Sequence, residues 1–121
     1  WFDAVVARHA VMTCGVDEWA LTKLDVLDGF PTLKLAVAYE LDGRRIEHFP
    51  ANVRAAARCR PLYEEMPGWR TSTKDVTRFA DLPDAAKRYV ARLEQLTGVP
   101  VGILSLGPRR ASTLILGERD A

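Results

Sequence analysis

The stretch LPDAAKRYVARLEQLTGVPVGILS, residues 82–105, predicts a helix that is followed directly by a strand. Pro83 suits the first position of a helix, and Asp84 complements the positive end of the helix dipole. Gly98 and Pro100 predict the end of the helix. Apolar and aromatic side chains recur at helical spacing and mark its buried face: Leu82, Ala86, Tyr89, Val90, Leu93 and Leu96.

A second helix and strand are predicted at the start of the chain. Asp3 can cap a helix over Ala4–Thr13, and Gly15 can end it. Trp19–Leu27 then has the pattern of a strand that is apolar on both faces, as central parallel strands are. The strand of the first unit covers Val101–Ser105. Helices that alternate with strands in this way are typical of the α/β class.

A β-hairpin is predicted in the middle of the chain. Residues in Leu33–Leu41 alternate between large apolar and smaller or polar side chains, which is the period of a half-buried strand. Asp42-Gly43 is a strong signal for a two-residue turn. Arg44–Phe49 is therefore predicted to return as the partner strand.

Weaker signals follow the hairpin and the long helix. Asn52 can cap a short helix that runs through Arg58. Glu64–Thr73 is predicted to be a loop in which Trp69 is buried. Ser112–Leu116 is predicted to be a last strand. Since no boundary divides the chain, we expect a single α/β domain with an added hairpin.

The composition is that of an ordinary globular domain. The 121 residues are 48% hydrophobic and 27% charged, and the net charge of +1 gives no reason to expect a nucleic-acid or membrane-surface partner. The longest apolar runs are too short to span a bilayer. Cys14 and Cys59 are isolated, which indicates buried, inert thiols in a reducing, cytoplasmic compartment. Because the chain opens on Trp1 and Phe2 without a Met, we expect a piece of a longer protein.

Thr22-Lys23-Leu24-Asp25 has the form T-K-x-D at the carboxyl end of a predicted strand, where α/β proteins bind ligands. Alternation along a strand would point Lys23 and Asp25 to the same side. A carboxylate accepts two parallel hydrogen bonds, and guanine offers two donors side by side, its ring N–H and its exocyclic amine. Adenine has an acceptor at the equivalent ring nitrogen, and a lysine stem can lie along the face of a base. This pattern favours guanine recognition, and the alternative is a pair of solvated residues at a strand end.

The stretch LSLGP, residues 104–108, also leaves a strand end and enters a tight turn. Its backbone N–H groups are candidates to meet the carbonyl oxygen of guanine, and the alternative is a β-turn without a ligand. The sequence contains neither GxxxxGK[ST] nor GxGxxG, so it has no obvious phosphate-binding loop. These patterns predict a site that holds a base and does not position a γ-phosphate.

Several other polar side chains are interpreted as structural. His9 and His48 lie far apart in the sequence and lack metal-ligand spacing. Asp28 precedes a glycine and is typical of a turn rather than of a catalytic acid. Glu64 and Glu65 are adjacent carboxylates, which rarely point at one ion. We therefore predict no catalytic residue and no metal site in this chain.

Several longer blocks resemble the C-terminal part of adenylosuccinate synthetase. They are LTKLDVLDGF, VAYELDGRRIEHFPAN, PLYEEMPGW, DLPDAAKRYVARLEQLTGVPVGILSLGP and STLIL, in this order, and the resemblance covers the whole chain. It implies the C-terminal portion of a P-loop-like, mostly parallel sheet with flanking helices. It also implies a guanine pocket formed by Lys23, Leu24, Asp25, Ser105, Leu106 and Gly107.

The same resemblance implies that the full-length protein is a ligase. That family uses GTP and Mg2+ to join IMP and L-aspartate into adenylosuccinate, in purine (AMP) biosynthesis. It implies a homodimer, and it places the phosphate, IMP and aspartate contacts N-terminal to this segment, so that this chain alone is expected to be inactive. Arg109 stands where the family usually has an acidic residue, which reverses a charge beside the pocket. The alternative is a non-catalytic remnant or a protein-interaction domain that keeps the fold.

Overall fold

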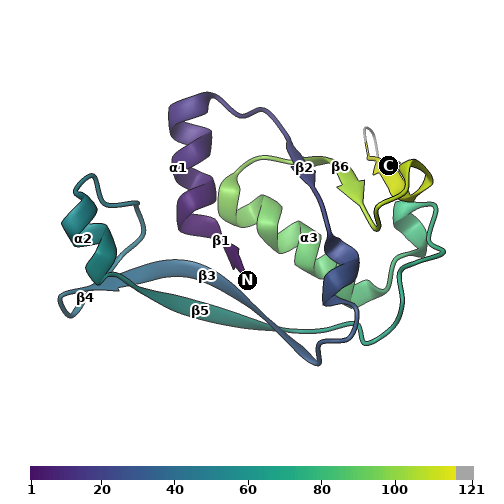
Figure 1. Cartoon of the computed structure of the whole chain (residues 1–121), viewed down its shortest axis with the longest axis horizontal. Coiled ribbons are helices and arrows are strands. Elements are labelled where there is room, and N and C mark those ends of the chain that lie inside the picture. Colours follow the sequence, from purple (N-terminus) through teal and green to yellow (C-terminus); the bar gives the residue numbers. More distant parts are fainter. Residues whose placement is uncertain (117–121) are drawn as a thin grey trace.

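The computed structural model describes residues 1–116, which form two small sheets and three α-helices. The first sheet contains β1 (Phe2–Asp3), β3 (Thr32–Leu41), β4 (Arg44–Ile46) and β5 (Arg60–Pro67). The second sheet contains β2 (Trp19–Leu21), β6 (Val101–Ser105) and β7 (Thr113–Ile115). The helices are α1 (Ala4–Cys14), α2 (Val53–Arg58) and α3 (Asp84–Thr97). In Figure 1, α1 and α3 lie above the long β3–β5 ribbon.

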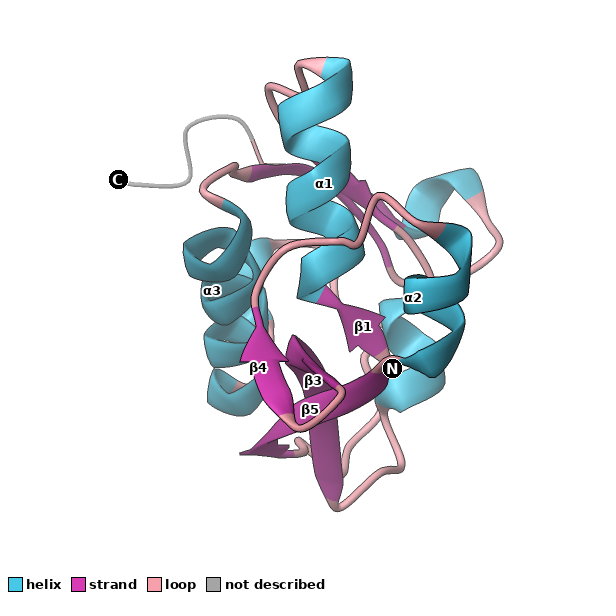
Figure 2. Cartoon of the chain, turned by 90° about the vertical axis from the view of Figure 1, so that its left-hand side faces the viewer, coloured by secondary structure: helices cyan, strands magenta, loops and turns pink. Residues whose placement is uncertain are grey.

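Both sheets combine parallel and antiparallel neighbours. β1 runs parallel to β3, and β2 runs parallel to β6. β4 and β5 are antiparallel to β3, and β7 is antiparallel to β6. The predicted α/β class is thereby confirmed, with two mixed sheets. The β4 hairpin and α2 form one end of the molecule, which faces the viewer in Figure 2.

The helix ends follow the predicted caps. The Asp3 carboxylate accepts hydrogen bonds from two amides in the first turn of α1, and the Asn52 side chain does the same for α2. Gly15 after α1 and Gly98 after α3 adopt left-handed conformations, with φ of 65° and 72°. These local side-chain and backbone signals were sufficient to place the three helices.

The β3–β4 hairpin is confirmed, although its second strand is shorter than predicted. Asp42 and Gly43 have φ of 51° and 82°, the pair of positive angles that a tight two-residue hairpin turn requires. β4 ends at Ile46 rather than at Phe49, so the pairing covers three residues on each strand.

The prediction of a loop over Glu64–Thr73 is wrong for its first part. Arg60–Pro67 is strand β5, and it pairs with β3 from Thr32 opposite Pro67 to Glu40 opposite Arg60. Within residues 1–116, β5 has β3 as its sole strand partner, so its other edge carries no ladder. A strand in this position tolerates proline, because no hydrogen bond is required on the open side. That explains how a stretch bounded by prolines forms the longest antiparallel pairing of the fold.

Side chains of β3, α3 and β6 meet in one apolar core. Trp69, predicted to be buried, is 7% exposed and packs edge to face against Tyr89 of α3, with ring centroids 5.9 Å apart. The largest side chains with almost no exposure include Leu24, Leu33, Leu35, Val90, Leu93 and Leu104. The helical face predicted from the sequence is the one that faces this core.

The two thiols differ in part from the prediction. Cys14 is exposed at the end of α1, and Cys59 is partly exposed just after α2. The prediction that both are buried is wrong, because each lies where a helix ends at the surface. Both are free thiols.

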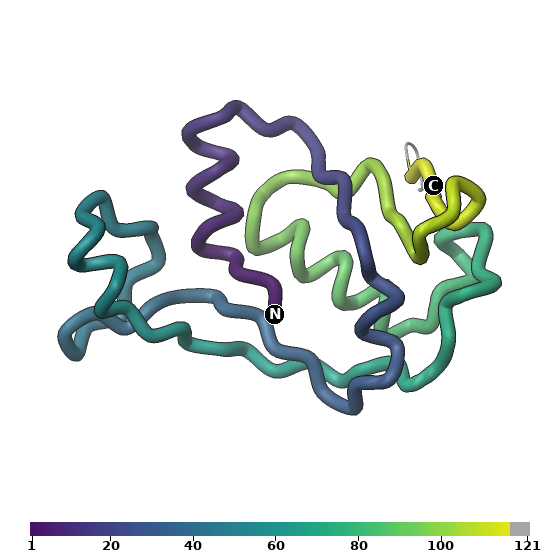
Figure 3. Tube along the Cα trace, viewed as in Figure 1, coloured from purple at the N-terminus to yellow at the C-terminus, as the bar shows by residue number. Residues whose placement is uncertain are grey.

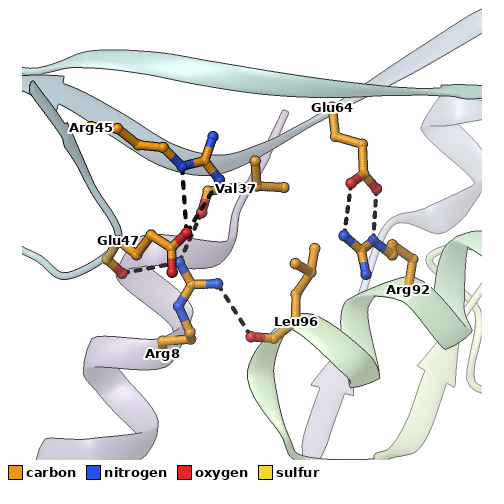
Figure 4. A network of polar contacts seen from close by, with 7 residues as sticks. All are labelled: Arg8, Val37, Arg45, Glu47, Glu64, Arg92 and Leu96. Carbon is orange, nitrogen blue, oxygen red and sulfur yellow. Dashed lines mark hydrogen bonds and ion pairs between the residues drawn. The ribbon is translucent and has the colours of Figure 1, made fainter.

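Arg8 joins α1 to three other parts of the fold. Its guanidinium donates hydrogen bonds to the backbone carbonyls of Val37 (2.8 Å), Glu47 (3.0 Å) and Leu96 (3.3 Å), as Figure 4 shows. These carbonyls belong to β3, to the segment after β4 and to α3. One side chain therefore fixes the two long helices on the first sheet.

Candidate functional site

A groove of about 530 Å³ lies at the end of the molecule opposite the β4 hairpin. Three segments that are far apart in the sequence line it: residues 25 and 28, residues 72 and 74–77, and residues 106–109 with 111 and 112. Figure 3 shows the corresponding stretches of the trace converging at this end. We refer to them as the 25–28 turn, the 72–77 segment and the 106–112 turn.

The 25–28 turn follows β2 after residues 22–24. The prediction of one strand over Trp19–Leu27 is wrong beyond Leu21, where β2 ends. Lys23 adopts a left-handed conformation with φ of 60°, and Leu24–Leu27 then forms a 3-10 helix. A left-handed residue cannot continue a strand, so the chain bends sharply at this point.

Because of this bend, the predicted site residues Lys23, Leu24 and Asp25 lie in three different environments. Leu24 is 1% exposed and belongs to the core, Asp25 is half-buried and lines the groove, and Lys23 is exposed. The prediction that Lys23 and Asp25 point to the same side of a strand is wrong, because neither residue is in a strand. Neither Lys23 nor Leu24 is among the residues that line the groove.

The 106–112 turn follows β6 directly. Ser105 donates its hydroxyl hydrogen bond to the Gly107 carbonyl at 2.9 Å, which closes the turn on itself. The Leu106 amide donates to the Ser112 carbonyl at 2.9 Å, and the Leu106 side chain is 2% exposed. A Cβ placed on Gly107 would lie 3.2 Å from the Ser112 hydroxyl oxygen, a tight contact that a small movement of the Ser112 side chain would relieve.

Three of the six predicted residues therefore line one groove. Asp25 approaches it from the 25–28 turn, and Leu106 and Gly107 approach it from the 106–112 turn. Ser105 is the last residue of β6, and it contacts the turn through its hydrogen bond to Gly107. The two motifs are separated by about eighty residues in the sequence and meet at the same groove.

The 72–77 segment is the part of the groove that sequence reasoning missed. It is held by the carboxylate of Asp28, which accepts hydrogen bonds from the Trp69 indole N–H (2.7 Å), the Thr73 amide (2.8 Å) and the Thr73 hydroxyl (3.0 Å). Asp28 lies in a turn, as predicted, but its side chain also ties together segments 45 residues apart. No local motif encodes such a contact.

The groove carries charges of both signs. Asp25, Asp28 and Asp75 contribute carboxylates, and Lys74 and Arg109 contribute cations. Among residues 1–116, no group of three or more His, Cys, Asp or Glu side chains is placed to hold a metal ion. None of the helices in this part of the chain is long and apolar enough to cross a membrane.

Comparison with known proteins gives one consistent family. Residues 1–114 match the family model of adenylosuccinate synthetase. The adenylosuccinate synthetases of Thermosynechococcus vestitus and Parasynechococcus marenigrum are each 51% identical to this chain over 118 residues. A structure described as fully ligated adenylosuccinate synthetase from Plasmodium falciparum superimposes on 95% of the chain, with a TM-score of 0.89 and 27% identity.

The chain corresponds to one part of these relatives. Both curated sequences match over 98% of this chain, which is 26% and 27% of their own lengths. The solved structure is covered over 28% of its chain. The match includes all three segments that line the groove, up to residue 114. The chain therefore belongs to the adenylosuccinate synthetase family.

Proposed function

We propose that this chain supplies the guanine-binding groove of a GTP-dependent ligase that joins IMP and L-aspartate to form adenylosuccinate. The observation that carries the proposal is that Asp25 and the Leu106–Gly107 turn line the same groove. The family of the chain supports the identity of the reaction.

Asp25 is the residue that distinguishes guanine from adenine in this proposal. Its carboxylate offers only acceptors, and Asp25 lines the groove of about 530 Å³. The ring N–H and exocyclic amine of guanine can donate to its two oxygens in parallel. Adenine would present a ring nitrogen acceptor to the same carboxylate, which leaves two acceptors facing each other and no proton between them.

The other five residues have supporting roles. Leu24 anchors Asp25 to the core, and Ser105 fixes the shape of the turn that contains Leu106. Since the Leu106 amide already bonds to Ser112, the Gly107 amide is our candidate donor to the guanine carbonyl oxygen. Lys23 is exposed and does not line the groove, and we propose that its long stem reaches over the face of a bound base from beside Asp25.

The chemical steps are assigned to other parts of the full-length enzyme. In the proposed reaction GTP phosphorylates the 6-oxygen of IMP, and the aspartate amine then displaces that phosphate. The sequence contains no phosphate-binding loop motif, so we assign the GTP phosphates, Mg2+, IMP and L-aspartate to residues outside this chain. We also propose that the full-length protein is a homodimer in the cytoplasm.

The test is a titration of the 121-residue chain with GDP and, separately, with ADP, followed by amide NMR shifts. We expect GDP to shift resonances from all three groove segments and ADP to leave them in place. Asp25→Ala should abolish the GDP response, whereas Asp17→Ala, which removes an exposed carboxylate outside the groove, should retain it. No response to either nucleotide would reject base binding by this chain and favour a non-catalytic domain.

A further inference from the structure

We propose that Asp28 is a positioning residue of the groove, which holds the 72–77 segment in place so that a guanine nucleotide is enclosed on a third side. This inference rests on the proposed function, because it assigns a further residue to the same site. It concerns a residue that does not belong to the T-K-x-D motif or to the Ser-Leu-Gly turn.

The Asp28 carboxylate connects two segments of the chain, and we call its contacts with Trp69 and Thr73 the joint. Both carboxylate oxygens are used, in bonds to the Trp69 indole and to the amide and hydroxyl of Thr73. Thr73 is 0% exposed, and hydrogen bonds to an ionised acceptor that are shielded from water are the stronger ones. Trp69 in turn packs against Tyr89 of α3. The joint therefore fixes the start of the 72–77 segment to the core.

The 72–77 segment contains neither helix nor strand, and besides its contacts with Asp28 it packs the Val76 side chain against the core. The bonds from the Lys74 amide to the Ser72 hydroxyl and from the Val76 amide to the Thr73 carbonyl lie within the segment. They shape it without attaching it to the rest of the groove. The attachment to the 25–28 turn runs through Asp28 and Thr73.

The backbone on both sides of the joint is also closely packed. The Gly68 amide donates to the Pro31 carbonyl at 2.9 Å. A Cβ added to Gly68 would collide with the Phe30 carbonyl oxygen. The two backbones are therefore closer together than any residue other than glycine would allow at position 68. The chain after Asp28 and the chain before Thr73 are thus held together independently of any ligand.

The joint also sets the position of Asp25 relative to the opposite side of the groove. The Asp28 amide donates to the Asp25 carbonyl at 3.1 Å, so both aspartates belong to one 3-10 turn. When the Asp28 side chain holds Thr73, the distance between the Asp25 carboxylate and the 72–77 segment is fixed. Without it, Asp25 would keep its own backbone position, while the start of the facing segment would lose its hydrogen bonds to the 25–28 turn.

The test compares four variants of the 121-residue chain: Asp28→Asn, Thr73→Val, Thr73→Ser and Asp25→Ala. Thr73→Ser keeps the hydroxyl that bonds to Asp28, and Thr73→Val removes it at nearly constant volume. Three quantities are measured: the Kd for GDP, the hydrogen-exchange rates of the 72–77 amides, and the chemical shift of the Trp69 indole proton. Thermal unfolding is followed so that binding is compared well below each midpoint.

We expect Asp28→Asn and Thr73→Val to weaken GDP binding by about tenfold, which corresponds to the loss of one hydrogen bond to a charged group. The 72–77 amides should exchange faster, and the Trp69 indole proton should shift in Asp28→Asn. Thr73→Ser should restore the GDP affinity to within about twofold. Electrostatics alone predicts tighter GDP binding for Asp28→Asn, because removing an anion from the groove favours an anionic nucleotide.

The outcomes distinguish a failure of the positioning role of Asp28 from a failure of the proposed function. If Asp25→Ala abolishes GDP binding but Asp28→Asn and Thr73→Val leave it unchanged, the positioning role is wrong and the proposed function stands. If Thr73→Ser and Thr73→Val weaken binding equally, the hydroxyl contact is not responsible and the positioning role is also wrong. If the wild-type chain does not bind GDP, the proposed function fails and this inference fails with it.

Discussion

Glu64 on β5 and Arg92 on α3 form a two-point ion pair, in which Nε donates to Oε2 and Nη2 to Oε1, both at 2.7 Å. Figure 4 shows the guanidinium and the carboxylate facing each other across the gap between strand and helix. The pair attaches the C-terminal half of α3 to the outermost strand of the first sheet. The hydrogen bond from Arg92 holds the pKa of the Glu64 carboxyl below its usual value.

This ion pair predicts a pH dependence of stability. Because the pKa of Glu64 is lowered in the folded state, the pair stabilises the fold above the ordinary carboxyl pKa of about 4.5, and this contribution is lost as the pH falls further. Glu64→Gln should reduce the free energy of unfolding by about 1 kcal/mol at pH 7. The difference from wild type should shrink as the pH is lowered progressively below the ordinary carboxyl pKa, as a series of denaturant titrations from pH 7 downwards would measure. Glu65→Gln, which removes the carboxylate of an exposed neighbour, is the matched control.

The close approach of the Gly68 and Phe30 backbones predicts that alanine substitution destabilises the fold more at Gly68 than at Gly29. Gly68→Ala would place a methyl group against the Phe30 carbonyl, so we expect a loss of about 3 kcal/mol or more in the free energy of unfolding. Gly29→Ala is the matched control, because a Cβ at Gly29 meets no atom within 4 Å and its φ is not positive. Thermal unfolding of both variants measures the contrast. Equal midpoints would show that the 67–73 backbone can move away from Phe30 at little cost.

The proposed recognition of guanine by Asp25 predicts a change of nucleotide preference. Asp25→Asn replaces one acceptor oxygen by a donor amide, so guanine should bind about tenfold or more weakly, and xanthine should gain relative affinity. Xanthine carries an oxygen where guanine has its exocyclic amine. Competition between GDP and XDP for the Asp25→Asn chain measures this reversal. An unchanged preference for GDP would exclude the proposed hydrogen-bond pair.

Arg109 predicts a salt-dependent contribution to nucleotide binding. It lines the groove at an exposed position, whereas its equally exposed neighbour Arg110 does not line it. Arg109→Asp should weaken GDP binding by about three- to tenfold at low ionic strength, and the effect should fade at high salt. Arg110→Asp changes the net charge by the same amount and should have a smaller effect. If the two variants weaken binding equally, the contribution comes from overall charge and not from the groove.

The parts of the fold that could be predicted are those whose signals are local. Asp3 and Asn52 cap helices through bonds to amides two and three residues away, and Asp42-Gly43 turns the hairpin by itself. β5 was missed because its residues have weak strand preference and prolines near both ends. Its structure depends on pairing with β3, which no short window of sequence can reveal.

The candidate site, like the fold, could be predicted only where its signals are local in the sequence. The T-K-x-D motif and the Ser-Leu-Gly turn located Asp25, Leu106 and Gly107, which line the groove. The strand expected through Leu27 was wrong, because an apolar run of this length does not distinguish a buried strand from a 3-10 turn. The 72–77 segment was missed because Asp28 brings it to the groove from 45 residues away.

Leu24 and Leu106 each precede a residue that lines the groove, and they are 1% and 2% exposed. A side chain locked in the core immobilises the backbone of the residue that follows it. The backbone positions of Asp25 and Gly107 are therefore fixed by folding itself. Binding at these two points should cost little conformational entropy, so that association is expected to proceed as a single kinetic phase without a slow ordering step.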